Sequence, residues 1–416
     1  MDSVELYRQL LGVTAPWSVQ RVDMDVHGLR VDVHLEHAPA ARFACPQCGR
    51  ECSVYDHAAE RSWRHLDSCH FQTVLHARAP RVNCSEHGVR LVELPWAEPG
   101  GRFTRLFEAL AVDVLLATDV KKAATILGIT WDEAWNIMER AVVRGRRIKR
   151  STMPELIGVD EKAIAKGHRY MTLVCDLEQA TVEYIGDDRR QVSLDAYFDA
   201  FDPEALQALR AVCMDMWPPY INACLDKVEQ AEQKIVFDRF HIMWHVVDAV
   251  DTVRKREHKA LLSVGDATLS KSKYLWLYSA ENVPPKWHER FNELKGANLK
   301  TARAWALKES LRELWDHRRA ADAKRFWQRW YFWATHSRLK PMIDAAKMIA
   351  RHLPNVLTYF THRISNAMAE GLNSKIATIQ KRACGYRNAE RFKIAVYFHC
   401  GGLNLWPQRW THSKVG

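Results

Sequence analysis

The chain has 416 residues, of which 47% are hydrophobic and 26% charged, and its formal net charge is +10. This length allows several domains, and the composition excludes a disordered chain. The ten cysteines are not spaced as in a small secreted disulfide scaffold, and no apolar run reaches the roughly 18 to 20 residues that cross a bilayer. The basic excess favours a polyanionic partner. The first residues lack the pattern of a signal peptide, so we expect a cytoplasmic protein.

The first predicted segment, residues 1–100, alternates apolar and polar side chains as strands do. It contains two ligand pairs, Cys45 with Cys48 and Cys84 with His87. Three thiolates and one imidazole, paired across two intervening residues, are a common tetrahedral zinc set. We therefore predict one structural Zn²⁺ in an N-terminal zinc-binding module, rather than isolated cysteines in a small core. Substitutes for the fourth ligand are Cys52, His65, Cys69 and His70.

The second segment, residues 101–150, predicts a helix, a turn at Gly128 and a second helix opened by a capping box of Thr130 and Glu133. This is the pattern of a DNA-binding helix-turn-helix, whose second helix would enter the major groove. An ordinary helical hairpin has the same pattern. The basic end of the segment is the better candidate for phosphate contact. Its residues are Arg140, Arg144, Arg146, Arg147, Lys149 and Arg150.

The third segment, residues 151–254, alternates strand and helix patterns and predicts an α/β sheet. Asp160 and Asp215 each follow a short apolar run, where a strand would bring them to the same edge of the sheet. Asp238 follows a further apolar strand and is a rival acidic residue. Glu161 adjoins Asp160 and should face the opposite side of its strand.

The fourth segment, residues 255–345, reads as an all-helical insertion into the α/β domain. Seven of the 16 tryptophans lie in it, and tryptophans at helical spacing are usually packed in a core. Residues 270–279 and 286–291 mix basic and aromatic side chains, so they are better candidates for stacking on bases.

The last segment, residues 346–416, contains a predicted helix over about 366–383. Glu370 shares a polar face with Asn366 and Asn373. The predicted apolar stripe consists of Met368, Leu372, Ile376 and Ile379. Basic residues follow that would either bind phosphate or form a solvated face: Lys375, Lys381, Arg382, Arg387 and Arg391.

Two strand-end aspartates and a helix-borne glutamate, Asp160, Asp215 and Glu370, are the predicted catalytic residues. Alone, a strand-end aspartate is usually a turn residue and a helical glutamate is usually solvated. Together, their oxygens suit two Mg²⁺ or Mn²⁺ ions. Two such ions about 3.5 to 4 Å apart activate the attacking oxygen and stabilise the leaving oxygen of a phosphodiester.

Several blocks of sequence resemble one known family, the bacterial DDE transposases of the ISL3 insertion-sequence family. They are "CPQCG", "RSWRHLD", "RVNCSEHGVR", "GVDEKA", "CMDMWPPY", "VFDRFHIM", "KYLWLYS" and "SNAMAEGLNSKIATIQKRACGYRN". The resemblance implies a multi-domain α/β protein in which an RNase H-like core is interrupted by a helical insertion. A zinc ribbon-like β module and a helix-turn-helix would precede that core. The resemblance also implies the same catalytic trio, although this chain has "CSEH" where relatives are expected to carry a second pair of cysteines.

The resulting hypothesis is a DNA transposase that binds the terminal inverted repeats of an insertion sequence and catalyses strand cleavage and strand transfer. Its expected partners are double-stranded DNA at the element ends and the target, and a second copy of the chain on DNA. No membrane is expected, and the protein would be nucleoid-associated. The alternatives are a DNA-binding regulator with an inactive core and another RNase H-fold nuclease. Magnesium-dependent nicking separates the first alternative, and strand-transfer products separate the second.

Overall fold

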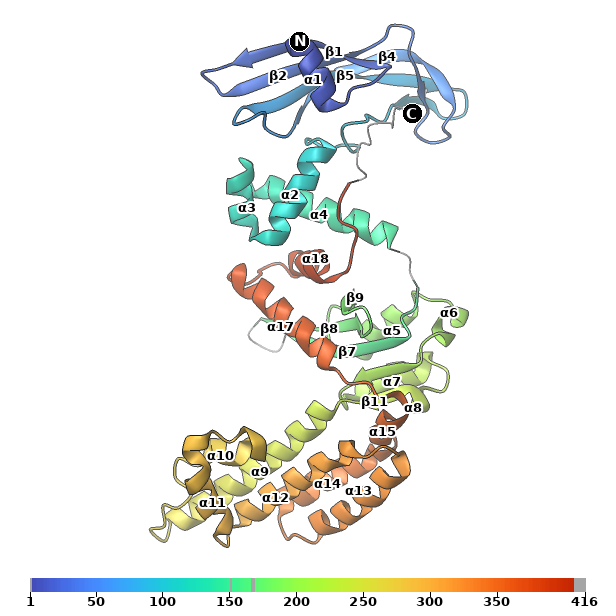
Figure 1. Cartoon of the computed structure of the whole chain (residues 1–416). Coiled ribbons are helices and arrows are strands. Elements are labelled where there is room, and N and C mark those ends of the chain that lie inside the picture. The colour runs from blue at the N-terminus through green and yellow to red at the C-terminus, as the bar shows by residue number, and fades with distance from the viewer. Residues whose placement is uncertain (1, 150–151, 166–168, 408–416) are drawn as a thin grey trace.

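The computed structural model describes residues 2–149, 152–165 and 169–407. Figure 1 shows an elongated molecule in which an N-terminal sheet, a group of helices, a second sheet and a helical bundle follow one another. The predicted mixed α/β class, with an N-terminal β region, is confirmed. Within the described residues, no helix is both long and apolar enough to span a membrane.

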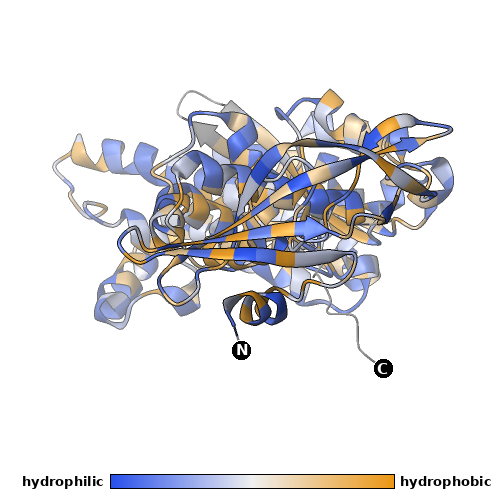
Figure 2. Cartoon of the chain, turned by 90° about the horizontal axis from the view of Figure 1, so that it is seen from above, coloured by the Kyte–Doolittle hydropathy of each residue, from blue (hydrophilic) through white to orange (hydrophobic). Residues whose placement is uncertain are grey.

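The N-terminal module is a six-stranded sheet with one helix, α1 (Ser3–Leu11). The strand order is β1-β2-β5-β4-β3, with β6 paired to β5. Val31, Val33 and Leu35 are buried while the residues between them are less so, which is the alternation predicted for a half-buried strand. The same alternation appears as changing colour along the strands in Figure 2. The strands are β1 (Trp17–Asp25), β2 (Arg30–His37), β3 (Arg42–Ala44), β4 (Glu51–Arg64), β5 (Gln72–Cys84) and β6 (Gly88–Leu91).

Three helices follow, and local sequence sets the ends of the last two. They are α2 (Arg105–Ala117), α3 (Val120–Leu127) and α4 (Trp131–Ile148). Gly128 closes α3 with a left-handed φ of 63°, a conformation that costs glycine little. The predicted capping box opens α4, because the Thr130 hydroxyl accepts from the Glu133 amide while the Glu133 carboxylate accepts from the Thr130 amide.

The second sheet has the strand order β11-β10-β7-β8-β9. Its strands are β7 (Leu156–Ala165), β8 (Arg169–Asp176), β9 (Thr181–Ile185), β10 (Ala211–Met214) and β11 (Ile235–Phe237). Strands β7, β10 and β11 are parallel to one another, whereas β8 is antiparallel to both of its neighbours. The helices between these strands are α5 (Gln191–Phe198), α6 (Pro203–Gln207), α7 (Pro218–Lys227) and α8 (Ala231–Lys234).

A helical bundle follows β11 and begins earlier than the sequence suggested. Helix α9 (Arg239–Leu262) runs across the boundary predicted at 254/255 and packs on α12 and α14. Four of the seven tryptophans are buried, as expected for packing residues: Trp276, Trp315, Trp327 and Trp330. The remaining helices are α10 (Lys273–Leu277), α11 (His288–Gly296), α12 (Lys300–Arg312), α13 (Ala320–Thr335), α14 (Lys340–Arg351), α15 (Leu353–Leu357) and α16 (Tyr359–His362). Three short 3-10 helices, Ala280–Asn282, Pro285–Trp287 and Glu313–Asp316, lie between them.

The chain then returns to the second sheet through α17 (Ala367–Arg382) and α18 (Ala389–Cys400). Helix α17 packs on β7, and α18 lies between β9 and α4 (Figure 1). The helix predicted over 366–383 is therefore confirmed. Its apolar stripe differs at one position, because Ala369 is buried against the sheet while Met368 is 44% exposed. One apolar core joins α17, α18 and the face of β8 and β9 to helices α2–α4.

Candidate active site and metal centre

Three aspartates lie on or directly after the three parallel strands of the second sheet. Asp215 and Asp238 directly follow β10 and β11, whereas Asp160 lies within β7 and not at its end as predicted, because β7 continues to Ala165 in its pairing with β8. Pairing of Cys213 with Gly158 places Asp215, two residues farther on, level with Asp160 and on the same face. Asp238 directly follows β11, and its amide donates to the Met214 carbonyl at 2.8 Å. The sheet register thus brings together residues that are up to 78 positions apart in the chain, as predicted for the two aspartates.

Helix α17 crosses this face of the sheet and completes the surroundings of Asp160. A Cβ on Gly158 would lie 2.6 Å from the Asn366 Oδ1 atom, so only a glycine admits the helix this closely. From α17, the Asn373 Nδ2 atom donates to Asp160 Oδ2 at 2.5 Å. Lys162, on the same side of β7, donates to the Asn373 carbonyl at 3.1 Å. Asn373 is therefore a direct partner of Asp160.

Burial disfavours the ionised forms of Asp160 and Asp215. Burial raises the pKa of Asp160 to about 6, and the negative charges of Asp215 and Asp238 push it in the same direction. Burial also raises the pKa of Asp215, whose Oδ1 accepts from the Trp217 amide at 3.0 Å. A nearby cation would reverse this balance by favouring the carboxylate forms. Carboxylate oxygens that lie close together are the ligands that hard divalent ions prefer.

Glu370 lies in the first turn of α17 and is exposed. It lines a cleft of about 540 Å³ together with Asp238. Burial raises its pKa, as does the charge of Asp238. The site is more open than the N-terminal cluster. In the described part of the chain, one group of three or more His, Cys, Asp or Glu residues has all its ligand atoms within 4.8 Å of one another, and it contains none of these carboxylates.

Two further residues belong to this site and were not among the predicted catalytic residues. Asp238 is only 3% exposed, and its Oδ1 accepts from the Asn366 amide at 3.3 Å. Its Oδ2 lies 3.2 Å from the Nδ1 atom of His241, and this partner raises the pKa of His241. The sequence signal was an aspartate at a strand end followed three residues later by a histidine in the first helical turn. Glu161 pairs with Arg189 at 3.3 Å, and its charge helps to raise the pKa of Asp215, so it lies near the site although it was predicted to face the other side of the strand.

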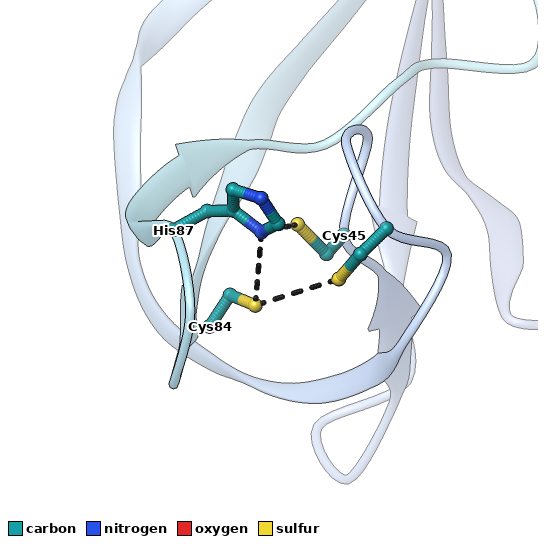
Figure 3. Close-up of side chains that lie close together, drawn as sticks. Cys45, Cys84 and His87 are labelled. Atoms are coloured by element: carbon teal, nitrogen blue, oxygen red, sulfur yellow. Dashed lines mark hydrogen bonds between the residues drawn. The ribbon is translucent and has the colours of Figure 1, made fainter.

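The four predicted zinc ligands gather at one end of the N-terminal sheet (Figure 3). The Sγ atoms of Cys48 and Cys84 are 3.7 Å apart, and His87 Nδ1 lies 3.6 Å from Cys84 and 3.8 Å from Cys45. Tetrahedral zinc with Zn–S of about 2.3 Å and Zn–N of about 2.0 Å requires ligand separations of roughly 3.5 to 3.8 Å. The four side chains are therefore spaced as the ligands of a closed structural zinc site.

None of the four substitute ligands belongs to the group formed by Cys45, Cys48, Cys84 and His87. His65 is buried, and its Nδ1 atom lies 2.9 Å from the Thr104 hydroxyl. Cys52 lies near the cluster but is directed to the Arg50 carbonyl, at 3.4 Å. Cys69 is exposed and His70 stacks on Phe71. The fourth position of the cluster is thus filled by His87, as predicted.

Comparison with known proteins agrees with the order of these parts. A family model described as the transposase of the DDE ISL3 type matches residues 157–396, which is more than half of the chain. The chain belongs to the ISL3 family of transposases. A model for the zinc-finger of the transposases of IS204, IS1001, IS1096 and IS1165 matches residues 41–87, and a model for the helix-turn-helix domain of the ISL3 family matches residues 92–142.

Individual relatives match this transposase along nearly its whole length. It is 29% identical over 395 residues to the transposase for insertion sequence element IS1001 of Bordetella parapertussis, covering 93% of this chain and 96% of that protein. It is 26% identical to the transposase for insertion sequence element IS1557 of Mycobacterium tuberculosis, with both chains covered in full. The chain is therefore a transposase with a helix-turn-helix DNA-binding domain and a zinc-finger module.

The basic residues predicted to bind DNA fall into two groups in this transposase. Some are engaged inside the protein: Arg140 pairs with the buried Glu108 at 2.6 Å, and Arg144 is buried and donates to the Leu405 carbonyl at 2.6 Å. Lys149 pairs with Glu183 at 2.6 Å, so it ties the end of α4 to the second sheet. These three contacts stabilise the packing of helices α2–α4 on neighbouring parts of the chain.

The remaining basic residues are more accessible. Arg146 stacks on the ring of Tyr397, and Lys375 donates to the His399 carbonyl at 2.7 Å. Arg150 lies outside the described residues. The exposed members of the predicted set are Arg146, Arg147, Lys375, Lys381, Arg382 and Arg387.

Proposed function

We propose that this transposase cleaves DNA at the terminal inverted repeats of its insertion element and joins the freed ends to target DNA. Asp160, Asp215 and Glu370 would be its catalytic carboxylates. The observation that carries the proposal is the convergence of aspartates from neighbouring parallel strands under α17, the helix that bears Glu370. Glu370 is linked to these aspartates through Asp238, with which it lines one cleft and whose charge raises its pKa.

We further infer an RNase H-like core. The support is the five-stranded order β11-β10-β7-β8-β9, in which β8 alone among the five described strands pairs antiparallel on both sides, together with the glutamate-bearing helix across β7. The bundle between β11 and α17 then corresponds to the helical insertion. It occupies the stretch from α9 to α16.

Each residue of the site has a separate proposed role. Asp160 and Asp215 would offer oxygens to the cations, and Glu370 would approach from the helix side. Two bound Mg²⁺ or Mn²⁺ ions would lower the charge on the scissile phosphate and favour the attacking oxygen. The Asn373 amide holds the Asp160 carboxylate in place. His241, held by Asp238, would place a positive charge beside the DNA phosphate.

The reaction proceeds in two displacements. A water oxygen attacks the phosphorus at the element end, and the bond from phosphorus to the 3′ oxygen breaks, leaving a 3′-hydroxyl. That hydroxyl oxygen then attacks a phosphorus of the target strand, whose own 3′ oxygen leaves and takes up a proton. The number of phosphodiester bonds is unchanged in the second step, so it needs no energy source.

DNA binding is assigned to the accessible cations. We propose that Arg147, Lys381, Arg382 and Arg387 contact phosphates, whereas Arg140, Arg144 and Lys149 position the helices that present them. A second copy of the chain on the other element end completes the proposed assembly. Mass measurement of the protein–DNA complex tests that homodimer.

The decisive experiment is a magnesium-dependent cleavage and strand-transfer assay on DNA carrying the element's own ends. Wild type is compared with Asp215→Ala, Glu370→Ala and the control Glu204→Ala, which removes an exposed carboxylate on α6. Wild type and the control should cut and join, while the two site variants bind DNA and do neither. Binding without cutting by wild type would favour a regulator, and cutting without joining would favour a nuclease.

A further inference from the structure

A wide groove separates the helix-turn-helix from the end of α17 that is remote from Glu370. Its volume is about 1160 Å³. One wall comes from α3 and the start of α4, and the other from the turn between α17 and α18. These walls are more than 240 residues apart in the chain, and Figure 1 shows the end of α17 below α3.

The groove is strongly basic on both walls. Lys121 and Lys122 stand on the α3 wall, and the α17–α18 wall carries the basic side chains Arg382, Arg387 and Arg391. Among its described lining residues the one carboxylate is Asp119, which caps α3 by accepting from the Lys122 amide at 3.0 Å. Asp119 also pairs with the Lys122 ammonium group at 3.6 Å, so the groove lining has five cations and one carboxylate that is already paired.

The floor is apolar and partly exposed. Trp131 opens α4, is 39% exposed and stacks on Trp135 with the ring planes 13° apart. The Arg391 guanidinium lies over the Trp131 ring at 4.8 Å from its centroid. The indoles thus hold one rim arginine in place, which favours a fixed basic surface over a set of freely moving side chains.

The basic lining of the groove favours a polyanion as its ligand. The position of the groove between the helix-turn-helix and α17 favours DNA. Cations on two facing walls match the two phosphate strands that border a groove of a duplex better than they match one small anion. Arg382 is 12 residues from Glu370, so it lies about 18 Å away along the helix. That is about half of a B-DNA turn of roughly 34 to 36 Å, or about five base pairs.

We propose that this groove binds the backbone of the same duplex whose scissile phosphate lies at the carboxylates. This inference rests on the proposed function, and it adds that the helix-turn-helix and the catalytic helix α17 hold one stretch of DNA between them. Docking of the element end would then fix the position of α17, and with it Glu370. End recognition and assembly of the active site would be linked through one helix.

Binding to a short duplex is measured on the full chain as a function of salt, with a single-stranded oligonucleotide of the same sequence as a second probe. One variant removes the two cations of the α3 wall (Lys121→Ala with Lys122→Ala). Another removes two cations of the α17–α18 wall (Arg382→Ala with Arg387→Ala). Each loses about two phosphate contacts, so the slope of log affinity against log salt should fall by about 1 to 2. The matched control, Lys324→Ala with Arg329→Ala on α13, removes the same charge and should keep the slope.

A native thiol gives a second readout without mutation. Cys384 is exposed and lines the groove. Duplex DNA should slow its alkylation several-fold, as followed by peptide mass spectrometry. Wild-type slopes in both wall variants, with alkylation of Cys384 unchanged by duplex, would overturn the inference, as would protection by the single strand alone. If the wild-type chain does not bind DNA at all, the proposed function is refuted instead.

Discussion

The zinc module and the carboxylate site differ in how their ligands are brought together. In the zinc module, two pairs with two-residue spacing lie on turns at one end of a sheet, and all four ligand atoms are within 4.8 Å of one another. The carboxylates come from three strands and from a helix that is separated from them by a whole bundle. A local motif thus builds a closed site, whereas the remote carboxylates form an open and electrostatically strained one.

This difference matches the two proposed tasks, structural zinc binding and DNA cleavage. A structural metal site gains most when its ligands are close and shielded, because metal binding then adds directly to folding. A site that must admit a DNA strand has to keep one side open, and Glu370 is accordingly exposed. Burial raises the pKa of Asp160 to about 6, so the ionised form of this side chain is disfavoured in the folded chain.

The largest expected effect comes from breaking the zinc set. Cys84→Ser removes a central ligand, since the Cys84 thiol lies within 3.7 Å of both Cys48 and His87. Zinc content should fall from about one ion per chain to near zero, and the N-terminal module should become sensitive to protease. The rest of the chain should stay folded, because its cores are separate. The control is Cys69→Ser, an exposed thiol outside the set. Full zinc content in the Cys84 variant would refute the ligand assignment.

Sequence reasoning was strongest where a pattern is local. The zinc ligands, the capping box of Thr130 and the helix over 366–383 follow from spacing alone, and the structure has all three. The start of the helical bundle was missed because α9 follows Asp238 with no Gly or Pro to mark a boundary. The engagement of Arg144 was also missed, since its partners Glu98 and Leu405 come from distant segments. Such partners depend on tertiary packing, which a single sequence does not display.

In the candidate active site, too, the contact partners could not be predicted from the sequence. Both Asp160 and Asp215 were predicted at strand ends, which is wrong for Asp160 because β7 continues to Ala165. Only the sheet register shows that the two are level with each other and beside Asp238. Asn373 was placed on the polar face of its helix, and its bond to Asp160 depends on the close approach of α17 over Gly158. Residue types were thus predictable from the sequence, while their partners depended on the packing.

The close packing of α17 over Gly158 can be tested by a substitution in β7. Gly158→Val puts a branched side chain where a Cβ alone would lie 2.6 Å from Asn366 and 3.4 Å from the Ala369 Cβ. The helix must shift by about 1 Å, which costs roughly 1 to 3 kcal/mol of stability and up to about a hundredfold in rate. Strand cleavage and duplex binding are measured together. The control is Gly296→Val, where a Cβ meets nothing within 4 Å. Unchanged cleavage by the Gly158 variant would show that α17 does not position the site.

A smaller effect is expected from removing the buried charge of Asp160. An aspartate whose folded pKa is raised stabilises the fold below its unfolded pKa, about 3.9, and this contribution is lost as pH rises through about 6. Asp160→Asn removes the charge and keeps one of the two acceptor oxygens, which receive hydrogen bonds from the Asn373 side chain and from the Glu161 amide. In magnesium-free buffer it should therefore be about 2 kcal/mol more stable than wild type at pH 8, with little difference near pH 4. Thermal unfolding at the two pH values measures this. A variant that is less stable than wild type at pH 8 would contradict the strained-site description.

The smallest effect tests whether local capping matters beside a tertiary core. Thr130→Ala removes the hydroxyl that accepts from the Glu133 amide at 3.3 Å, and it should cost about 1 kcal/mol. The matched control is Thr125→Ala, whose hydroxyl donates to the Lys121 carbonyl inside α3 at 3.1 Å and is not needed for a helix end. Because alanine is the better helix former, the control should be neutral or slightly stabilising. Hydrogen exchange in the first turn of α4 separates the two. Equal exchange in both variants would mean that the packing of α4 on α2, α3 and α18 alone sets where this helix begins.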